Sequence, residues 1–206
     1  GIRNDGLLTI INSTISGNTA VRSGGGLSVI AGSVTIVGST ITNNTADSDH
    51  DNLGDGGGIH NFIGGSAIVL KNTIVAGNFA FSNNDINGSV DTTNSSYNLV
   101  GSGNGGLTNG DNGNQVGVAD PLLGPLANNG GQTNTHALLT GSPAIDQGQA
   151  FGATTDQRGT ARPYDDAGIA NASGGDGSDI GAFELPPIDF GDAPAGYPSA
   201  SHAARG

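Results

Sequence analysis

The sequence predicts an all-β fold in which the chain winds through a stack of similar coils, a parallel β-helix. Three observations lead to this prediction. Three segments of nearly the same sequence recur, a short run of aliphatic and β-branched residues precedes each of them, and a glycine triplet precedes each of the last two runs. Self-similarity at a period of about 20–50 residues is typical of stacked repeat architectures. The recurring segments are 13–20 (STISGNTA), 39–46 (STITNNTA) and 72–80 (NTIVAGNFA).

Each coil is expected to contain short strands with one buried face. We take Ile15, Ile41 and Ile74 as equivalent positions, which are 26 and 33 residues apart, with an insert at 47–55 in the longer unit. Upstream of each isoleucine the side chains alternate between the two faces, which is the period-two pattern of a strand. The residues predicted to face inward are Leu8 and Ile10, Val34 and Ile36, and Ala67 and Val69, with Thr9, Thr35 and Ile68 facing outward.

Three asparagines recur at nearly the same place in the repeat. Asn18, Asn44 and Asn78 follow the central isoleucine by three, three and four residues. Stacked coils would align them into a structural ladder in which each side-chain amide bonds to the next. The glycine triplets 24–26 and 56–58 are predicted to form tight turns that need positive φ. A phosphate-binding loop is excluded because no lysine follows either triplet.

Composition and charge narrow the class of protein. The 206 residues include 18 acidic and only six basic side chains, for a net charge of −12, with 38 glycines, few aromatic residues and no cysteine. Such an acidic surface repels nucleic acid and anionic membranes. The absence of cysteine excludes a disulfide framework and a thiolate metal site. No apolar run is long enough to insert into a bilayer, and we expect neither a nucleic acid partner nor membrane insertion.

The second half of the chain carries several motifs that occur together: 120–148 (DPLLGPLANNGGQTNTHALLTGSPAIDQG), 155–163 (TDQRGTARP) and 179–185 (DIGAFEL). With the upstream repeats, they closely resemble a bacterial family of right-handed parallel β-helix proteins, the choice-of-anchor Q domain proteins. The resemblance covers about residues 1–185. It implies a right-handed single-stranded parallel β-helix domain, truncated at its N-terminal end, and we expect roughly seven coils and an irregular C-terminal tail.

The tail has a different signature. Residues 186–206 are expected to be a linker and the truncated start of a following module, because the segment DFGDAP at 189–194 resembles the opening of a module of large bacterial surface proteins. Together the two resemblances imply an extracellular or cell-surface location. We therefore expect a non-catalytic structural or adhesive segment, whose partners would be an extracellular glycan or the surface of a host or neighbouring cell.

The sharpest candidate for ligand chemistry is the acidic insert. Asp47, Asp49 and Asp51 alternate along the chain, and Asp55 follows after a turn. Calcium takes several oxygen ligands, and this spacing lets one tight loop supply them. Asn52 stands where comparable loops have glycine and can adopt the left-handed conformation. The insert therefore predicts a calcium site of weak extracellular affinity, and the alternative is a solvated acidic loop.

The competing functional hypothesis is a carbohydrate-active β-helix that binds or cleaves a polysaccharide. Asp165 and Asp166 are the paired carboxylates, but adjacent strand residues point to opposite faces and are badly placed for hydrolysis. Arg158 and Arg162 are expected instead to pair with nearby acids and to fasten the last coils together. The candidate acids are Asp146, Asp156, Asp179 and Glu184.

The remaining candidates are histidines and threonines. The spacing of His50, His60, His136 and His202 matches no zinc motif. His60 and His136 are expected at half-exposed strand positions. The outward pairs Thr14/Ser16 and Thr40/Thr42 resemble a flat ice-binding array, but the pattern breaks in the third coil, and threonine is favoured on strands for other reasons.

Overall fold

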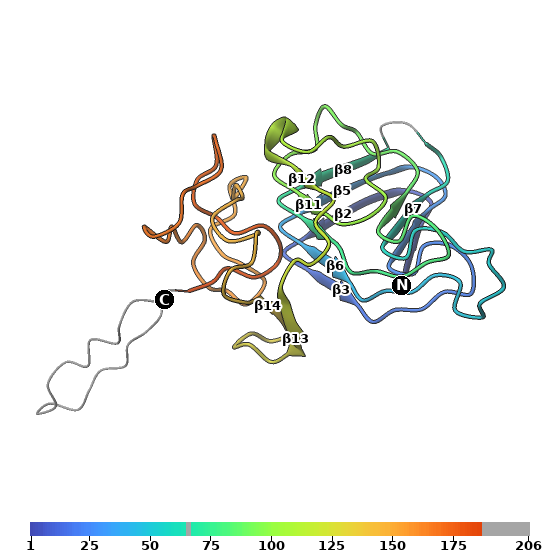
Figure 1. The fold of residues 1–206 in the computed structure, drawn as a ribbon, viewed down its shortest axis with the longest axis horizontal. Helices are drawn as coiled ribbons and strands as arrows, with labels where there is room; N and C mark the ends of the chain where they lie inside the picture. Colours follow the sequence, from blue (N-terminus) through green and yellow to red (C-terminus); the bar gives the residue numbers. More distant parts are fainter. Residues whose placement is uncertain (65–66, 187–206) are drawn as a thin grey trace, which may run out of the picture.

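The computed structural model describes residues 1–64 and 67–186, so the predicted module start at 187–206 lies outside the described residues. The fold is all-β, with three parallel sheets and one antiparallel pair of strands. Each passage of the chain through the parallel sheets, here called a winding, adds a strand beside the one before it (Figure 1). The start of the chain belongs to the repeat, because Ile2 pairs with Leu27 in the next winding.

The chain passes through the three parallel sheets in a fixed order, and its last two parallel strands then both join the third sheet. The first sheet contains β1 (Ile2–Asn4), β4 (Leu27–Val29), β7 (Ile59–Asn61) and β10 (Ile86–Asn87). The second sheet contains β2 (Leu7–Ile11), β5 (Ser33–Val37) and β8 (Ile68–Lys71). The third sheet contains β3 (Thr14–Ser16), β6 (Thr40–Thr42), β9 (Ile74–Val75), β11 (Leu99–Val100) and β12 (Gln115–Val116). A short 3-10 helix, η1 (Asp111–Gly113), precedes β12.

The chain beyond β12 does not extend the parallel sheets. Residues 119–186, here called the C-terminal segment, contain the antiparallel strands β13 (Leu123–Ala127) and β14 (Thr135–Leu138) and otherwise turns. The segment lies beside the third sheet (Figure 1). The largest parallel sheet thus has five strands in the described part of the chain, compared with the roughly seven coils expected. The physical reason is that the aliphatic residues of this segment pack sideways onto the third sheet.

The register of the third winding differs by one residue from the sequence prediction. Ile15 pairs with Ile41 as expected, but Ile41 pairs with Val75, and Ile74 lies beside Thr40. In the second sheet Val34 likewise pairs with Ile68. A shift of one residue moves a side chain to the other face of a strand, so Ile68 is fully buried in the interior, where Ala67 and Val69 had been predicted.

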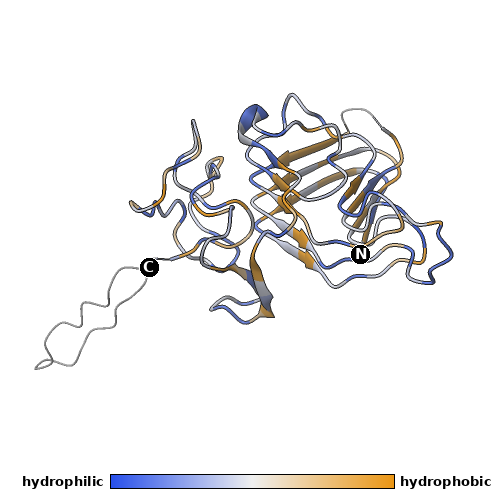
Figure 2. Ribbon diagram, viewed as in Figure 1, coloured by the Kyte–Doolittle hydropathy of each residue, from blue (hydrophilic) through white to orange (hydrophobic). Residues whose placement is uncertain are grey.

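Two apolar clusters explain why this register was ambiguous from the sequence. The first fills the interior between the three sheets and includes Ile36, Ile41, Leu70 and Val75. The second lies between the outer face of the third sheet and the C-terminal segment. It contains Ile74, Ala76, Leu99, Leu138, Ala144, Ile145, Ile180 and Phe183. At β9 and β11 both faces of the third sheet are therefore apolar, and alternation alone does not distinguish them there. In Figure 2 the strands of the windings are coloured mainly as hydrophobic.

Glycine is required in the two triplets for two reasons, a positive φ at the first position and close backbone stacking at the other two. Gly24 and Gly56 have φ of 76° and 61°, the left-handed conformation expected of turn glycines. The other glycines permit close stacking of neighbouring windings. A Cβ on Gly25 would lie 2.6 Å from the carbonyl oxygen of Gly57, and one on Gly26 would lie 2.7 Å from that of Gly58.

A row of side-chain amides runs through the stack. Asn18 donates from Nδ2 to Asn44 Oδ1, and Asn44 donates to Asn78 Oδ1, both over 2.9 Å. Each accepting oxygen also receives a backbone N–H from the winding before it. The row ends on the buried carboxylate of Asp85, which accepts from Asn78 over 2.9 Å.

A second amide row was not predicted. Asn98 accepts the backbone N–H of Thr73 over 3.0 Å, and Asn114 accepts from both the backbone and the side chain of Asn98. Asn98 also donates to the carbonyl of Leu70 over 2.9 Å. The two rows satisfy backbone groups at the bends that flank the third sheet, where strand pairing stops.

Replacing Asn44 tests the contribution of the first row. Asn44 is fully buried, and its amide donates to the carbonyls of Ile15 and Thr42 as well as to Asn78. We expect Asn44→Ala to lower the free energy of unfolding by about 3 kcal/mol, because several buried polar groups lose their partner. Urea denaturation followed by circular dichroism measures this loss.

Asn18→Ala is the matched control. Asn18 occupies the end of the same row and is partly exposed, so water can replace its bonds. The expected loss is about 1 kcal/mol or less. Equal losses for the two variants would contradict a stabilising role for burial of the row.

Candidate functional site

The acidic insert brings three carboxylates together. Asp47, Asp49 and Asp51 each place one oxygen within 4.8 Å of the others, and this group could hold a metal ion. Asp47 is buried, whereas Asp49 and Asp51 are exposed. Asn52 has a φ of 65°, so it adopts the left-handed conformation predicted for it. Its backbone N–H donates to Asp47 Oδ1 over 3.2 Å, which closes the loop.

The fourth predicted ligand, Asp55, lies outside this group. Its carboxylate accepts a hydrogen bond from the hydroxyl of Ser82 in the next winding, and its backbone N–H donates to Ser23 Oγ. Asp55 therefore connects neighbouring windings. Arg22 contacts Asp51 over 3.2 Å and compensates part of the negative charge of the loop.

The C-terminal segment covers the outer face of the third sheet. Thr14 donates to Gln157 Oε1 over 2.6 Å, and Ser16 Oγ lies 2.8 Å from His136 Nε2. Thr40 is buried and accepts the backbone N–H of Ala182 over 3.0 Å. The C-terminal segment thus occupies the face that carries Thr14, Ser16 and Thr40, so these side chains do not form a free flat array.

One turn position recurs in each winding, and in three of the windings its side chain bonds to the C-terminal segment. Asn12, Gly38, Asn72, Tyr97 and Gly113 occupy equivalent places just before the third sheet, and all five have positive φ. Asn12 donates to the carbonyl of Thr155 and Asn72 to that of Asp179, each over 2.8 Å. Tyr97 reaches the carbonyl of Ser173 with its hydroxyl over 3.1 Å. We call these five residues the turn row.

The arginines of the C-terminal segment pair with acids, as the sequence predicts. Arg158 contacts Asp156 and Arg162 contacts Glu184, both over 2.7 Å. The Arg162–Glu184 pair is buried, and the Arg158 guanidinium also lies 3.6 Å from the centroid of the Phe183 ring. These contacts hold 155–163 against 179–185.

The C-terminal segment buries more acidic side chains than the two arginines can pair with. The buried acids are Asp146, Asp156, Asp179 and Glu184. Asp179 accepts the backbone N–H groups of Asp146 and Leu185, yet burial and the nearby Glu184 carboxylate raise its pKa to about 7. Burial also raises the pKa of Asp146 and of Glu184, although Arg162 opposes the rise at Glu184. Asp146 Oδ2 is buried and has no hydrogen-bond partner among the described residues.

Asp166, His60 and His136 make contacts within the fold, whereas His50 is exposed in the acidic loop and His202 lies outside the described residues. Asp166 lies in a turn, where its carboxylate accepts the N–H of Gly168 and its own N–H bonds to Asp146. The prediction that His60 and His136 are half-exposed is wrong, because both are buried. His60 stacks on Phe62 with 3.8 Å between ring centroids. His136 is buried because the C-terminal segment lies against Ser16.

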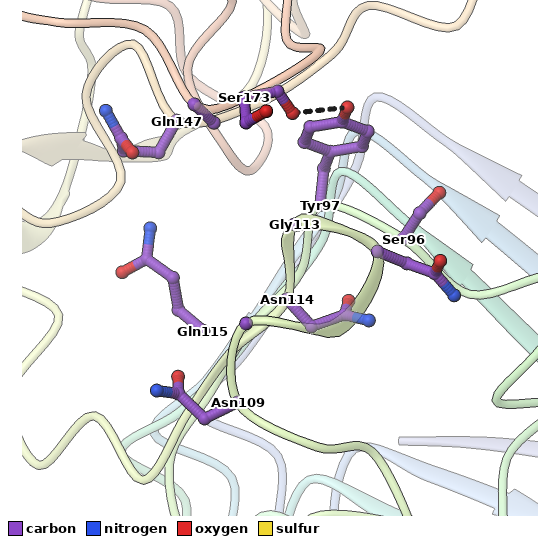
Figure 3. Close-up of a pocket in the computed structure, with 11 residues that line it drawn as sticks. Ser96, Tyr97, Asn109, Gly113, Asn114, Gln115, Gln147 and Ser173 are labelled. Carbon is purple, nitrogen blue, oxygen red and sulfur yellow. Dashed lines mark hydrogen bonds between the residues drawn. The ribbon is translucent and has the colours of Figure 1, made fainter.

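Two cavities lie along the seam between the windings and the C-terminal segment. The first, of about 630 Å³, is bordered by Tyr97, Asn109, Gln115 and Gln147 (Figure 3). The second, of about 650 Å³, is lined by residues that include Thr14, Gln132, Asp156, Gln157 and Arg158. Sequence reasoning missed both, because their walls come from segments far apart along the chain. The available signal was Tyr97, an aromatic residue at a turn position that otherwise holds Asn or Gly.

Comparison with known proteins gives no further assignment. No protein-family model, no curated protein and no solved structure matches this chain. Among the described residues, no helix has the length and apolar character needed to cross a membrane.

The pKa of Asp179 predicts a pH dependence of stability. The folded chain retains this proton up to about pH 7, whereas an unfolded aspartate loses it near pH 4. Between these values the folded state binds more protons, so the free energy of unfolding falls as pH rises, by up to about 4 kcal/mol from this group. Urea denaturation at a series of pH values measures the slope.

Asp179→Asn removes the titrating group and is expected to flatten this slope between about pH 4 and 7. Asp5→Asn is the control, since Asp5 is exposed and far from the cluster in the sequence. An unchanged slope in Asp179→Asn would contradict the assignment of the proton to this site.

Proposed function

We propose that this chain is a non-catalytic structural and adhesive segment of a large secreted or cell-surface bacterial protein. In this proposal its windings form a right-handed single-stranded parallel β-helix. The observation that carries the proposal is the parallel pairing from winding to winding, reinforced by the amide row of Asn18, Asn44 and Asn78. Such stacking transmits load through many backbone hydrogen bonds and presents long side faces for contact.

The location and the partners rest on the sequence resemblance and on charge. A net charge of −12 keeps neighbouring molecules apart and leaves an uncharged glycan or a cell surface as the partner class. The C-terminal segment supports the structural part of the proposal, because hydrogen bonds from Asn12, Asn72 and Tyr97 hold it against the windings, and the Arg162–Glu184 pair fastens it internally. It thereby covers a face whose apolar residues would otherwise be exposed.

We propose that Asp47, Asp49 and Asp51 bind a calcium ion. The three carboxylates offer hard oxygen ligands within one loop, and Asp47 is buried whereas the other two are exposed. An ion at this site would connect the insert to the base of its own winding. The few protein ligands and the exposure of two of them point to weak, extracellular-type affinity.

The alternative proposal is a carbohydrate-active β-helix. Polysaccharide hydrolysis uses two carboxyl groups about 5–9 Å apart across a groove. Asp156, which borders the second cavity, is already bonded to Arg158. The observation that favours a carbohydrate ligand is the polar first cavity, which suits binding without cleavage.

An activity assay tests the non-catalytic part of the proposal. The chain is incubated with neutral and uronic-acid polysaccharides, and reducing ends and unsaturated products are measured over time. The expected result is no product above that of a heat-inactivated sample. Product from any glycan would overturn the proposal in favour of a lyase or hydrolase.

Calcium is expected to raise the melting temperature by a few degrees at about 10 mM, because a ligand that binds only the folded chain stabilises it. Asp49→Asn should remove most of this rise, since it deletes an exposed ligand. Asp55→Asn is the matched control and should retain the rise, because Asp55 lies outside the group. Differential scanning fluorimetry and calorimetric titration measure the effect. Identical responses of the two variants would remove calcium from this loop.

A further inference from the structure

The geometry points to a binding site for an uncharged saccharide in the first cavity, bordered by Tyr97, Asn109, Gln115 and Gln147. This inference rests on the adhesive part of the proposed function and names the ligand class that part would take. The cavity has a volume of about 630 Å³, which lies within the usual range for small-ligand sites. Its walls are the bends before β11 and β12 on one side and the C-terminal segment on the other.

The cavity lies where the residue type in the turn row changes, from Asn or Gly in the first three windings to Tyr97 in the fourth. Asn12 and Asn72 are short and draw the C-terminal segment close to the windings. At the equivalent place Tyr97 reaches Ser173 with a longer side chain, and Gly113 in the next winding has no side chain at all. The seam is wider at this level, and Figure 3 shows the space between Tyr97 on one side and Gln115 and Gln147 on the other.

The backbone of Tyr97 is costly for an aromatic residue. Its φ of 53° lies in the left-handed region, where the other members of the turn row are Asn or Gly. A bulky side chain is unusual there, and such outliers are found where the side chain has a particular task. The Tyr97 ring also lies edge-on to Phe151, at 6.1 Å between centroids, so its orientation is restricted.

The lining is polar but carries no charge. Its eleven residues are amides, hydroxyls, glycine and alanine together with Tyr97, with no acidic or basic side chain. A charged ligand entering this cavity would lose hydration without gaining a counter-charge. The net charge of −12 further disfavours anionic polysaccharides at a distance.

Three side-chain amides that line the first cavity are held by hydrogen bonds within the protein, and each keeps a polar atom that has no partner in the residues that the structure describes. Gln115 donates to the carbonyl of Pro143 over 2.7 Å, and Gln147 donates to that of Ala170 over 2.8 Å. Asn109 accepts the backbone N–H of Val116 over 2.9 Å. Within the described part of the chain, no hydrogen bond reaches Gln115 Oε1, Gln147 Oε1 or Asn109 Nδ2. Two acceptors and one donor thus remain for a ligand.

A saccharide matches this set because each hydroxyl both donates and accepts a hydrogen bond. Adjacent hydroxyls of one sugar ring can donate to the two glutamine oxygens and accept from Asn109. The second cavity differs in kind, because the Arg158–Asp156 pair borders it. Variants in the second cavity therefore serve as controls for variants in the first.

The test is a titration of the ¹⁵N-labelled chain with neutral sugars, followed by NMR. The probes are glucose, galactose, mannose, N-acetylglucosamine and their β-linked oligomers, with galacturonate as the charged comparison and glycerol as a simple polyol. We expect at least one neutral sugar to shift the side-chain amide signals of Asn109, Gln115 and Gln147, with millimolar or tighter affinity. Galacturonate and glycerol are expected to bind at least about tenfold more weakly.

Variants locate the site. Gln115→Ala and Gln147→Ala should each weaken sugar binding about fivefold or more, whereas Gln132→Ala, a matched glutamine in the second cavity, should leave it unchanged. The inference is overturned if no neutral sugar shifts these signals at about 50 mM, well above the millimolar range. It is equally overturned if Gln132→Ala alone abolishes binding, or if glycerol binds as well as the sugars.

Thermal unfolding of each variant separates this inference from the structural proposal. Weakened sugar binding in Gln115→Ala with an unchanged melting temperature supports the site. Absence of sugar binding to the unchanged, folded chain counts against the site alone and leaves the structural role intact. If Gln147→Ala unfolds early because its bond to the C-terminal segment is gone, the titration of the unchanged chain decides. Product from the sugars in the activity assay would instead overturn the non-catalytic proposal and leave the site in place.

Discussion

The fold depends on every backbone group at a bend finding its partner in the neighbouring winding. Strands do this through parallel pairing, but each winding must also turn between sheets, where pairing stops. The rows that begin at Asn18 and at Asn98 supply bonds at those places, and the side-chain oxygens of Asn44, Asn78 and Asn114 each accept two N–H groups. Because an unpaired buried amide is costly, this requirement fixes asparagine at one point of each winding and sets the register of the whole stack.

The C-terminal segment packs against the windings at the third sheet. The inner face of this sheet belongs to the interior cluster, and its outer face packs against Ile145, Ile180 and Phe183. The turn row adds hydrogen bonds along the same edge. The C-terminal segment has little regular structure, so its position depends on this apolar contact and on its internal Arg162–Glu184 pair. The seam between the two parts is where cavities and buried charge occur.

The two candidate sites follow from different properties of the chain. The acidic insert is local: Asp47, Asp49 and Asp51 lie within one loop, and their alternation brings their oxygens together whatever lies around them. The first cavity is the opposite case. Tyr97, Gln115 and Gln147 belong to three parts of the chain, and the C-terminal segment brings them together. Its lack of charge sets it apart from the rest of an acidic molecule.

The sequence alone determined the all-β class, the parallel stacking, the asparagine row and the acidic loop, because each of these repeats or lies within a few residues. The pairing of Arg158 and Arg162 with nearby acids was also predictable from charge. The register of Ile74 and the burial of Thr40 and His136 were decided by tertiary structure. The physical reason is that alternation marks a buried face only when one face is buried, and the C-terminal segment buries the second face of the third sheet.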